Sequence, residues 1–191
     1  LGDAQSGHIR EVGFELYHSL LNEAVLKMQN TTGSVNLEYD QEWNPQLNLG
    51  LPVLIPSEYV SDMSVRLELY KRLSNLSGKI ELESFAAELI DRFGKLPKEI
   101  NSLLSVVQIK ALSKKMGINK IDISEKTISL ELRENHQLCP EKLIKYINSD
   151  FKKIRVRNKR LLFEIGPKKN KEKIKELFVI LRELRRLYLN S

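Results

Sequence analysis

The stretch Glu88-Leu89-Ile90-Asp91-Arg92-Phe93-Gly94-Lys95-Leu96-Pro97 ends one expected helix and begins another. Apolar residues upstream and within it recur at the three- and four-residue spacing of one helix face; they are Leu82, Phe85, Ala86, Leu89, Ile90 and Phe93. Gly94 has no Cβ and can adopt the left-handed conformation that ends many helices. Pro97, whose φ is fixed near the helical value, suits the first turn of a second helix. We therefore expect two helices joined at Gly94.

Two carboxylates of this stretch are expected to point away from the apolar face. Because an α-helix advances about 100° per residue, Glu88 and Asp91 lie one turn apart on the outer side. One interpretation is a solvated face, on which Glu88 and Arg92 support each other at i, i+4. The other is a docking site for arginines of another domain. The pattern alone favours the solvated face, since most charged helix positions serve solubility.

The composition indicates an ordinary globular protein of one or two domains. The chain has 191 residues, of which 41% are hydrophobic and 29% charged. No apolar run approaches the ~20 residues that span a bilayer, and no signal peptide is evident at the start of the sequence. The single cysteine, Cys139, excludes an internal disulfide and fits a reducing cytoplasm. We expect a cytoplasmic chain without membrane partners.

Positive charge is concentrated at the C-terminal end. Residues 1–149 hold 17 Lys and Arg against 20 Asp and Glu, whereas residues 150–191 hold 14 against 5. Such a segment either binds along an anionic partner, which would be DNA or an acidic protein surface, or forms the solvated face of an ordinary fold. The candidate contacts with DNA or an acidic surface are Lys168, Lys169, Lys171 and Lys173.

The first part of the chain combines a helix, extended segments and a small helical bundle. A helix is expected from about Glu11 to Met28, followed by a short polar linker. Alternating apolar residues predict extended segments at 35–39 and 47–55, and Pro52 places the second at a sheet edge or over the next helices. Three consecutive helices follow, starting at Ser61 or Asp62, at about Glu81 and at Pro97. Their short connections predict a bundle.

After Gly117 the apolar period changes from helical to two, which predicts strands. Hairpins are expected around Ser124-Glu125-Lys126 and near Asn158-Lys159. Each is followed by a helix, one from Pro140 and one from about Asn170. The order ββαββα predicts an antiparallel sheet covered on one face by helices. The fold class is therefore α+β, with an N-terminal linker helix, a small helical bundle and a ββαββα unit.

The sequence lacks the motifs of an independent enzyme. Neither Gly78-Lys79-Ile80 nor Gly94-Lys95-Leu96 has the glycine run and Ser or Thr of a phosphate-binding loop. The histidines, His8, His18 and His136, are scattered and do not form a metal-binding pattern. No acid pair adjoins a nucleophile. We expect no catalytic, cofactor or metal site here; the competing hypothesis of a hydrolase predicts ATP turnover by the chain.

Three ordered stretches in the first 100 residues resemble the C-terminal part of the bacterial transcription-repair coupling factors, Mfd, which are ATP-driven DNA translocases. These stretches are Leu1-Gly2-Asp3-Ala4-Gln5-Ser6-Gly7 with Val12-Gly13-Phe14-Glu15-Leu16-Tyr17 and Leu20-Leu21-Asn22-Glu23-Ala24-Val25; Ile55-Pro56 with Tyr59, Asp62, Arg66-Leu67 and Tyr70-Lys71-Arg72; and Glu88 through Pro97. Beyond Gly117 the likeness lies in layout more than in motif.

This resemblance implies two units. Residues 1–29 would be the end of a translocase lobe and a linker helix of a longer protein, and Gln5 would be a remnant of the motif that couples ATP hydrolysis to translocation. Residues 30–191 would be the C-terminal regulatory domain. The ATP and Mg²⁺ sites of the parent protein would lie outside this chain, which would carry no cofactor and no activity of its own.

The resemblance also implies partners. The regulatory domain would pack on the N-terminal UvrB-like module of the same protein, where Glu88 and Asp91 would meet arginines. This contact would mask the surface that recruits UvrA and would restrain translocation. RNA polymerase and duplex DNA would be reached indirectly, through the parent that displaces stalled polymerase and recruits nucleotide-excision repair. The hypothesis is thus an autoinhibitory clamp; the alternative is a DNA-binding module that acts through the basic C-terminal segment.

Overall fold

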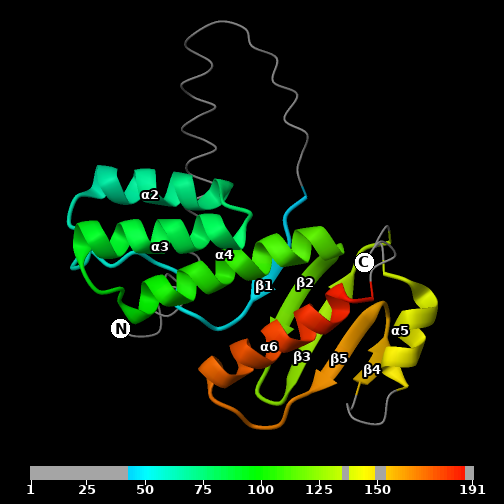
Figure 1. Cartoon of the computed structure of the whole chain (residues 1–191). Helices are drawn as coiled ribbons and strands as arrows, with labels where there is room; N and C mark the ends of the chain where they lie inside the picture. Colours follow the sequence, from blue (N-terminus) through cyan, green and yellow to red (C-terminus); the bar gives the residue numbers. More distant parts are fainter. Residues whose placement is uncertain (1–42, 135–137, 149–153, 188–191) are drawn as a thin grey trace, which may run out of the picture.

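A bundle of three helices lies beside a five-stranded sheet in the computed structural model, which describes residues 43–134, 138–148 and 154–187 (Figure 1). The mixed α+β class is as predicted. The helix expected at 11–28, the extended segment at 35–39 and the boundary near residue 30 lie outside the described residues.

The predicted bundle is confirmed, and local hydrogen bonds explain where its helices begin and end. It consists of α2 (Met63–Asn75), α3 (Lys79–Phe93) and α4 (Lys98–Met116). The Asp62 carboxylate accepts from the backbone N–H of Val65 and caps α2. The Glu81 carboxylate accepts from the N–H of Gly78, so α3 begins two residues earlier than predicted. Gly117, in the left-handed conformation at φ 62°, ends α4.

The sheet has the order β1-β2-β3-β5-β4. Its strands are β1 (Gln46–Asn48), β2 (Ile118–Ile123), β3 (Thr127–Leu132), β4 (Ile154–Arg157) and β5 (Arg160–Glu164). Both predicted hairpins are present, and β2, β3, β5 and β4 pair antiparallel. β1, which overlaps the extended segment expected at 47–55, lies at a sheet edge and pairs parallel to β2, outside the predicted antiparallel ββαββα unit. Asn48 and Asp122 lie 74 positions apart, a separation that local periodicity does not report.

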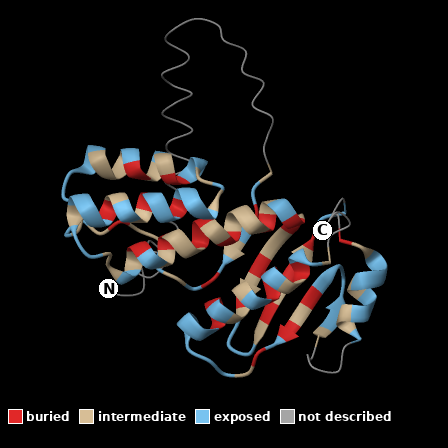
Figure 2. Ribbon diagram, viewed as in Figure 1, coloured by how far each residue is buried: buried red, intermediate tan, exposed pale blue. Residues whose placement is uncertain are grey.

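Helices cover one face of the sheet, as predicted. In β3 the residues alternate, with Ile128, Leu130 and Leu132 buried and those between them half-buried (Figure 2). α6 (Asn170–Arg185) buries Leu177, Leu181 and other apolar residues against this face. α5 (Pro140–Ile147) packs beside it through Leu143, Tyr146 and Ile147. Ile144 of the same helix is 58% exposed.

α4 contributes to both hydrophobic cores. Ile100, Leu103 and Val107 belong to the core of the bundle, together with residues of α2 and α3. Ile109 and Met116 belong to the core between the sheet and α6. The helix therefore joins the bundle to the sheet, and the two parts share one continuous element of structure.

Candidate docking surface

The C-terminal end of α3 is held by contacts with the loop before α2. Gly94, at φ 85°, ends the helix and donates its N–H to the Ile90 carbonyl at 2.9 Å. The Tyr59 hydroxyl lies 2.9 Å from the carbonyls of both Leu89 and Gly94 and donates to them. Its ring packs on Phe93, with centroids 5.8 Å apart. Side chains on this turn of α3 therefore project from a fixed backbone.

Glu88 is engaged by two arginines of its own chain. Arg72 of α2 donates from Nη1 to Oε1 at 2.8 Å and from Nη2 to Oε2 at 2.5 Å, a bidentate ion pair. Arg92 donates from Nη1 to Oε1 at 3.0 Å, which is the predicted i, i+4 pair. The Arg72 guanidinium also lies 5.2 Å from the ring centroid of Phe85. The carboxylate thus ties α2 to α3.

These contacts stabilise the charged form of Glu88. The bidentate hydrogen bonds from Arg72 lower the pKa of Glu88 from its ordinary value of 4.5 to about 2. The bond from Arg92 and the charges of both arginines act in the same direction, while partial burial opposes them. Glu88 is therefore ionised throughout the neutral range, and its charge is largely compensated within the chain.

Asp91 has no such partners. It is exposed, and its carboxylate makes no hydrogen bond or ion pair with any residue of the described part of the chain. Ile90 beside it is 51% exposed, so its assignment to the apolar face of α3 is wrong. We call Glu88, Ile90 and Asp91 the docking face. It presents one uncompensated carboxylate, one compensated carboxylate and one apolar side chain.

Sequence reasoning identified the two acids and missed Arg72 as a partner. Glu88 and Asp91 do lie one turn apart on the outer side of α3, but of the two only Asp91 lacks a partner among the described residues. The i, i+4 rule finds Arg92, whereas Arg72 is 16 positions away on another helix. The only sequence signal for it was its place in the motif Tyr70-Lys71-Arg72.

The four lysines of the basic segment do not form one surface. Lys173 is 7% exposed and donates from Nζ to the Ser124 carbonyl at 2.9 Å, so its assignment as a DNA contact is wrong. Its ammonium ties α6 to the β2–β3 turn. Lys168 pairs with Glu176 at 2.9 Å. Lys169 and Lys171 remain exposed at the start of α6.

Other residues considered in the sequence give no site in the described structure. Gln5 and His136 lie outside it. Among residues 43–134, 138–148 and 154–187, no three His, Cys, Asp or Glu side chains lie close enough to hold a metal ion. Cys139 is half-buried and precedes α5 as a free thiol.

Comparison with known proteins identifies the family of this chain. A family model described as the TRCF domain matches residues 49–143. The transcription-repair-coupling factor of Rickettsia typhi is 40% identical over 161 residues, which are 83% of this chain and 14% of that protein. The factor of Escherichia coli is 36% identical over 146 residues, 75% of this chain and 12% of that protein. The chain belongs to the transcription-repair coupling factor family.

A solved structure supports the fold of this coupling-factor chain. The crystal structure of the C-terminal domain of a transcription-repair coupling factor matches it with a TM-score of 0.66 at 22% identity. The match covers 76% of this chain and 94% of that domain. The chain spans between a tenth and a quarter of the length of the curated coupling factors it matches. No helix in the described residues is both long and apolar enough to cross a membrane.

Proposed function

We propose that this chain is the autoregulatory domain of a coupling factor and that it docks through α3 on the N-terminal UvrB-like module of the same protein. Docking would mask the surface of that module that recruits UvrA and would restrain translocation. The observation that carries the proposal is Asp91, an exposed carboxylate without a partner in the described structure, beside the exposed Ile90 on a helix end held by Tyr59.

The geometry suits an arginine-bearing partner. A carboxylate offers about four lone-pair positions, and the three hydrogen bonds to Glu88 leave one position, on Oε2. An arginine of the module would bind the Asp91 carboxylate through two parallel N–H···O hydrogen bonds. A second donor group of the module would reach the open position on Glu88 Oε2. Ile90, about 100° around α3 from Asp91, would add apolar contact on the side of Asp91 away from Glu88. In the docking face, the Asp91 carboxylate therefore has all of its acceptor positions available, whereas the Glu88 carboxylate has one.

Such an interface is releasable. Exposed ion pairs contribute about 0.2–1 kcal/mol each and weaken as salt rises. A contact built from a few of them is broken when another conformation of the parent offers better partners. That property suits a resting-state restraint, whereas a large apolar interface would suit permanent assembly.

The remaining activities belong, in this proposal, to the longer parent protein. ATP and Mg²⁺ binding, movement on duplex DNA and displacement of stalled RNA polymerase would reside outside these 191 residues. The chain alone would then hydrolyse no ATP. ATP turnover that co-elutes with the purified chain through successive chromatographic steps would overturn this part of the proposal.

The deciding experiment measures binding of the chain to the matching N-terminal module. Asp91→Asn removes the free charge without changing side-chain size, and we expect the dissociation constant to rise about twofold to fivefold, the effect of losing one exposed ion pair. Glu83→Asn is the control, because Glu83 is an exposed acid of α3 that pairs with Lys79 at 3.4 Å. Equal affinity of Asp91→Asn and the native chain would remove the docking assignment.

A further inference from the structure

The face of the sheet opposite α6 carries polar side chains in two cross-strand rows. One row runs from β1 to β4 through Gln46, Lys120, Glu131, Arg160 and Arg157. The other runs through Asn48, Asp122, Ser129, Leu162 and Arg155. Within the described residues, neither row contributes to a hydrophobic core. This face is therefore a surface of the domain, on the side away from the helices that cover the sheet.

Glu131 at the centre of the first row is engaged by two side chains. Its Oε1 accepts from Asn119 Nδ2 at 2.9 Å, and its Oε2 accepts from Arg160 Nε at 3.0 Å and forms an ion pair with Arg160 Nη2 at 2.8 Å. The hydrogen bond from Asn119 lowers the pKa of Glu131, and the contacts with Arg160 and the charge of Lys120 lower it further. The first row thus contains one carboxylate, which is already paired with Arg160.

Arg157 is left beside a like charge. It stands directly opposite Arg160 in the β4–β5 hairpin, an arrangement that costs stability unless an anion lies near. It is exposed, and its guanidinium makes no hydrogen bond or ion pair with another described residue. Lys159 follows in the turn, at φ 63°, and pairs with Glu134 at 2.5 Å. Since Lys159 and Glu134 are 68% and 81% exposed, water screens this pair and the ammonium is readily recruited.

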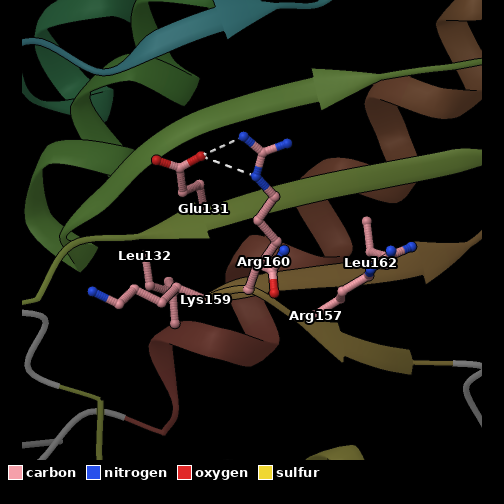
Figure 3. Close-up of a pocket in the computed structure, with 7 residues that line it drawn as sticks. Glu131, Leu132, Arg157, Lys159, Arg160 and Leu162 are labelled. Carbon is pink, nitrogen blue, oxygen red and sulfur yellow. Dashed lines mark hydrogen bonds and ion pairs between the residues drawn. The ribbon is translucent and has the colours of Figure 1, made fainter.

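These cations border a hollow on the open face. Its volume is about 560 Å³, and its lining includes Arg157, Lys159, Arg160 and the Glu131 carboxylate (Figure 3). Figure 3 shows Arg160 reaching toward Glu131, and no dashed line runs to the guanidinium of Arg157. The hollow therefore has three cationic groups around it and one carboxylate, which is already in use.

We propose that the β4–β5 hairpin binds the phosphodiester backbone of a nucleic acid, with Arg157 and Lys159 as its phosphate contacts and Arg160 at the floor. The guanidinium fork matches a phosphate bidentately. Arg155 lies two residues along β4, about 6.4–6.8 Å from Arg157. Its Nη2 lies 2.7 Å from Glu164 Oε1, and because the Arg155 side chain is 74% exposed, water screens this pair and a phosphate can compete for the guanidinium. A chain of phosphates can occupy both positions at once and gains from counterion release at each. An isolated acidic side chain would occupy only one of these positions and would release counterions only there.

The test is binding of the chain to a short mixed-sequence DNA duplex, followed by fluorescence anisotropy between about 50 and 200 mM salt. Arg157→Gln with Lys159→Gln should weaken binding about threefold to tenfold for each phosphate contact that the variant removes. The slope of log affinity against log salt should become shallower by about 0.9 per phosphate contact. Lys71→Gln with Lys95→Gln is the charge-matched control, because both lysines are exposed and lie in the helical bundle, and it should leave both quantities near those of the native chain.

Equal effects of the two double variants would overturn the proposal, because they would indicate net charge instead of a site. Displacement of the duplex by polyglutamate at equal charge concentration would also overturn it, in favour of an acidic peptide. The fluorescence of Trp43, whose Nε1 donates to Asn119 at 3.0 Å, monitors whether each variant keeps this end of the sheet.

Discussion

The Arg72–Glu88–Arg92 contacts make a prediction about pH. Because the pKa of Glu88 falls to about 2 on folding, its contribution to stability is fully present above its ordinary pKa of 4.5 and is lost as pH falls toward 2. Glu88→Gln should therefore lower the free energy of unfolding by about 1 kcal/mol at pH 7. The difference from the native chain should vanish near pH 2, as measured by denaturant titration at both pH values.

Asp91→Asn serves as the control for this prediction, since Asp91 has no partner among the described residues and its loss should change stability little at either pH. Native stability in Glu88→Gln at pH 7 would contradict the prediction, because it would mean that the two arginines gain nothing from the carboxylate.

Between elements, Arg72 competes with the proposed partner for Glu88. It lies on α2 and occupies one lone pair on each oxygen of a carboxylate on α3. Arg72→Gln should free both positions, so the proposed docking on the N-terminal module should tighten about threefold to tenfold, the value of one charged contact. In a Glu88→Gln background the same substitution should have no effect, and isothermal titration of the four variants measures this difference. Weaker docking of Arg72→Gln in both backgrounds would assign Arg72 itself to the interface.

The elements differ in how well the sequence predicts them. The hairpins, the caps at Asp62 and Gly117 and the inner face of α6 follow from local spacing, because each depends on neighbours a few residues away. The parallel pairing of β1 with β2 does not, since it joins segments separated by the whole bundle. Lys173 shows a second limit. A lysine among other lysines is expected at the surface, yet Lys173 is buried and its ammonium donates to the Ser124 carbonyl in a turn.

The contacts of the docking residues also divide into those that local sequence spacing predicts and those that it does not. Outward projection of Glu88 and Asp91 follows from helix geometry, and Arg92 follows from the i, i+4 spacing. Capture of Glu88 by Arg72 depends on how α2 packs on α3, and this packing has no periodic signature. Only the structure separates the two acids, among the residues it describes, into a compensated one and one without a partner.

On the scale of the whole molecule, α4 determines how the domain unfolds. Leu103 in the bundle core and Ile109 in the sheet core are both fully buried, and they lie less than two turns apart on one helix. Loss of either packing surface removes support for the same helix, so the bundle and the sheet should unfold together. Leu103→Ala should lower the free energy of unfolding by about 2–5 kcal/mol.

Two probes test this coupling. Trp43, the sole tryptophan of the sequence, hydrogen-bonds Asn119 beside β2 and reports on the sheet. Far-UV circular dichroism reports mainly on the helices. Although Leu103 lies in the bundle, Leu103→Ala should shift both transitions to the same lower denaturant concentration and keep them coincident. A fluorescence transition that stays at the native midpoint while the circular dichroism transition moves would mean that α4 is two independent halves. The docking face and the β4–β5 hairpin would then belong to separately stable units, because α3 packs in one core and β5 in the other.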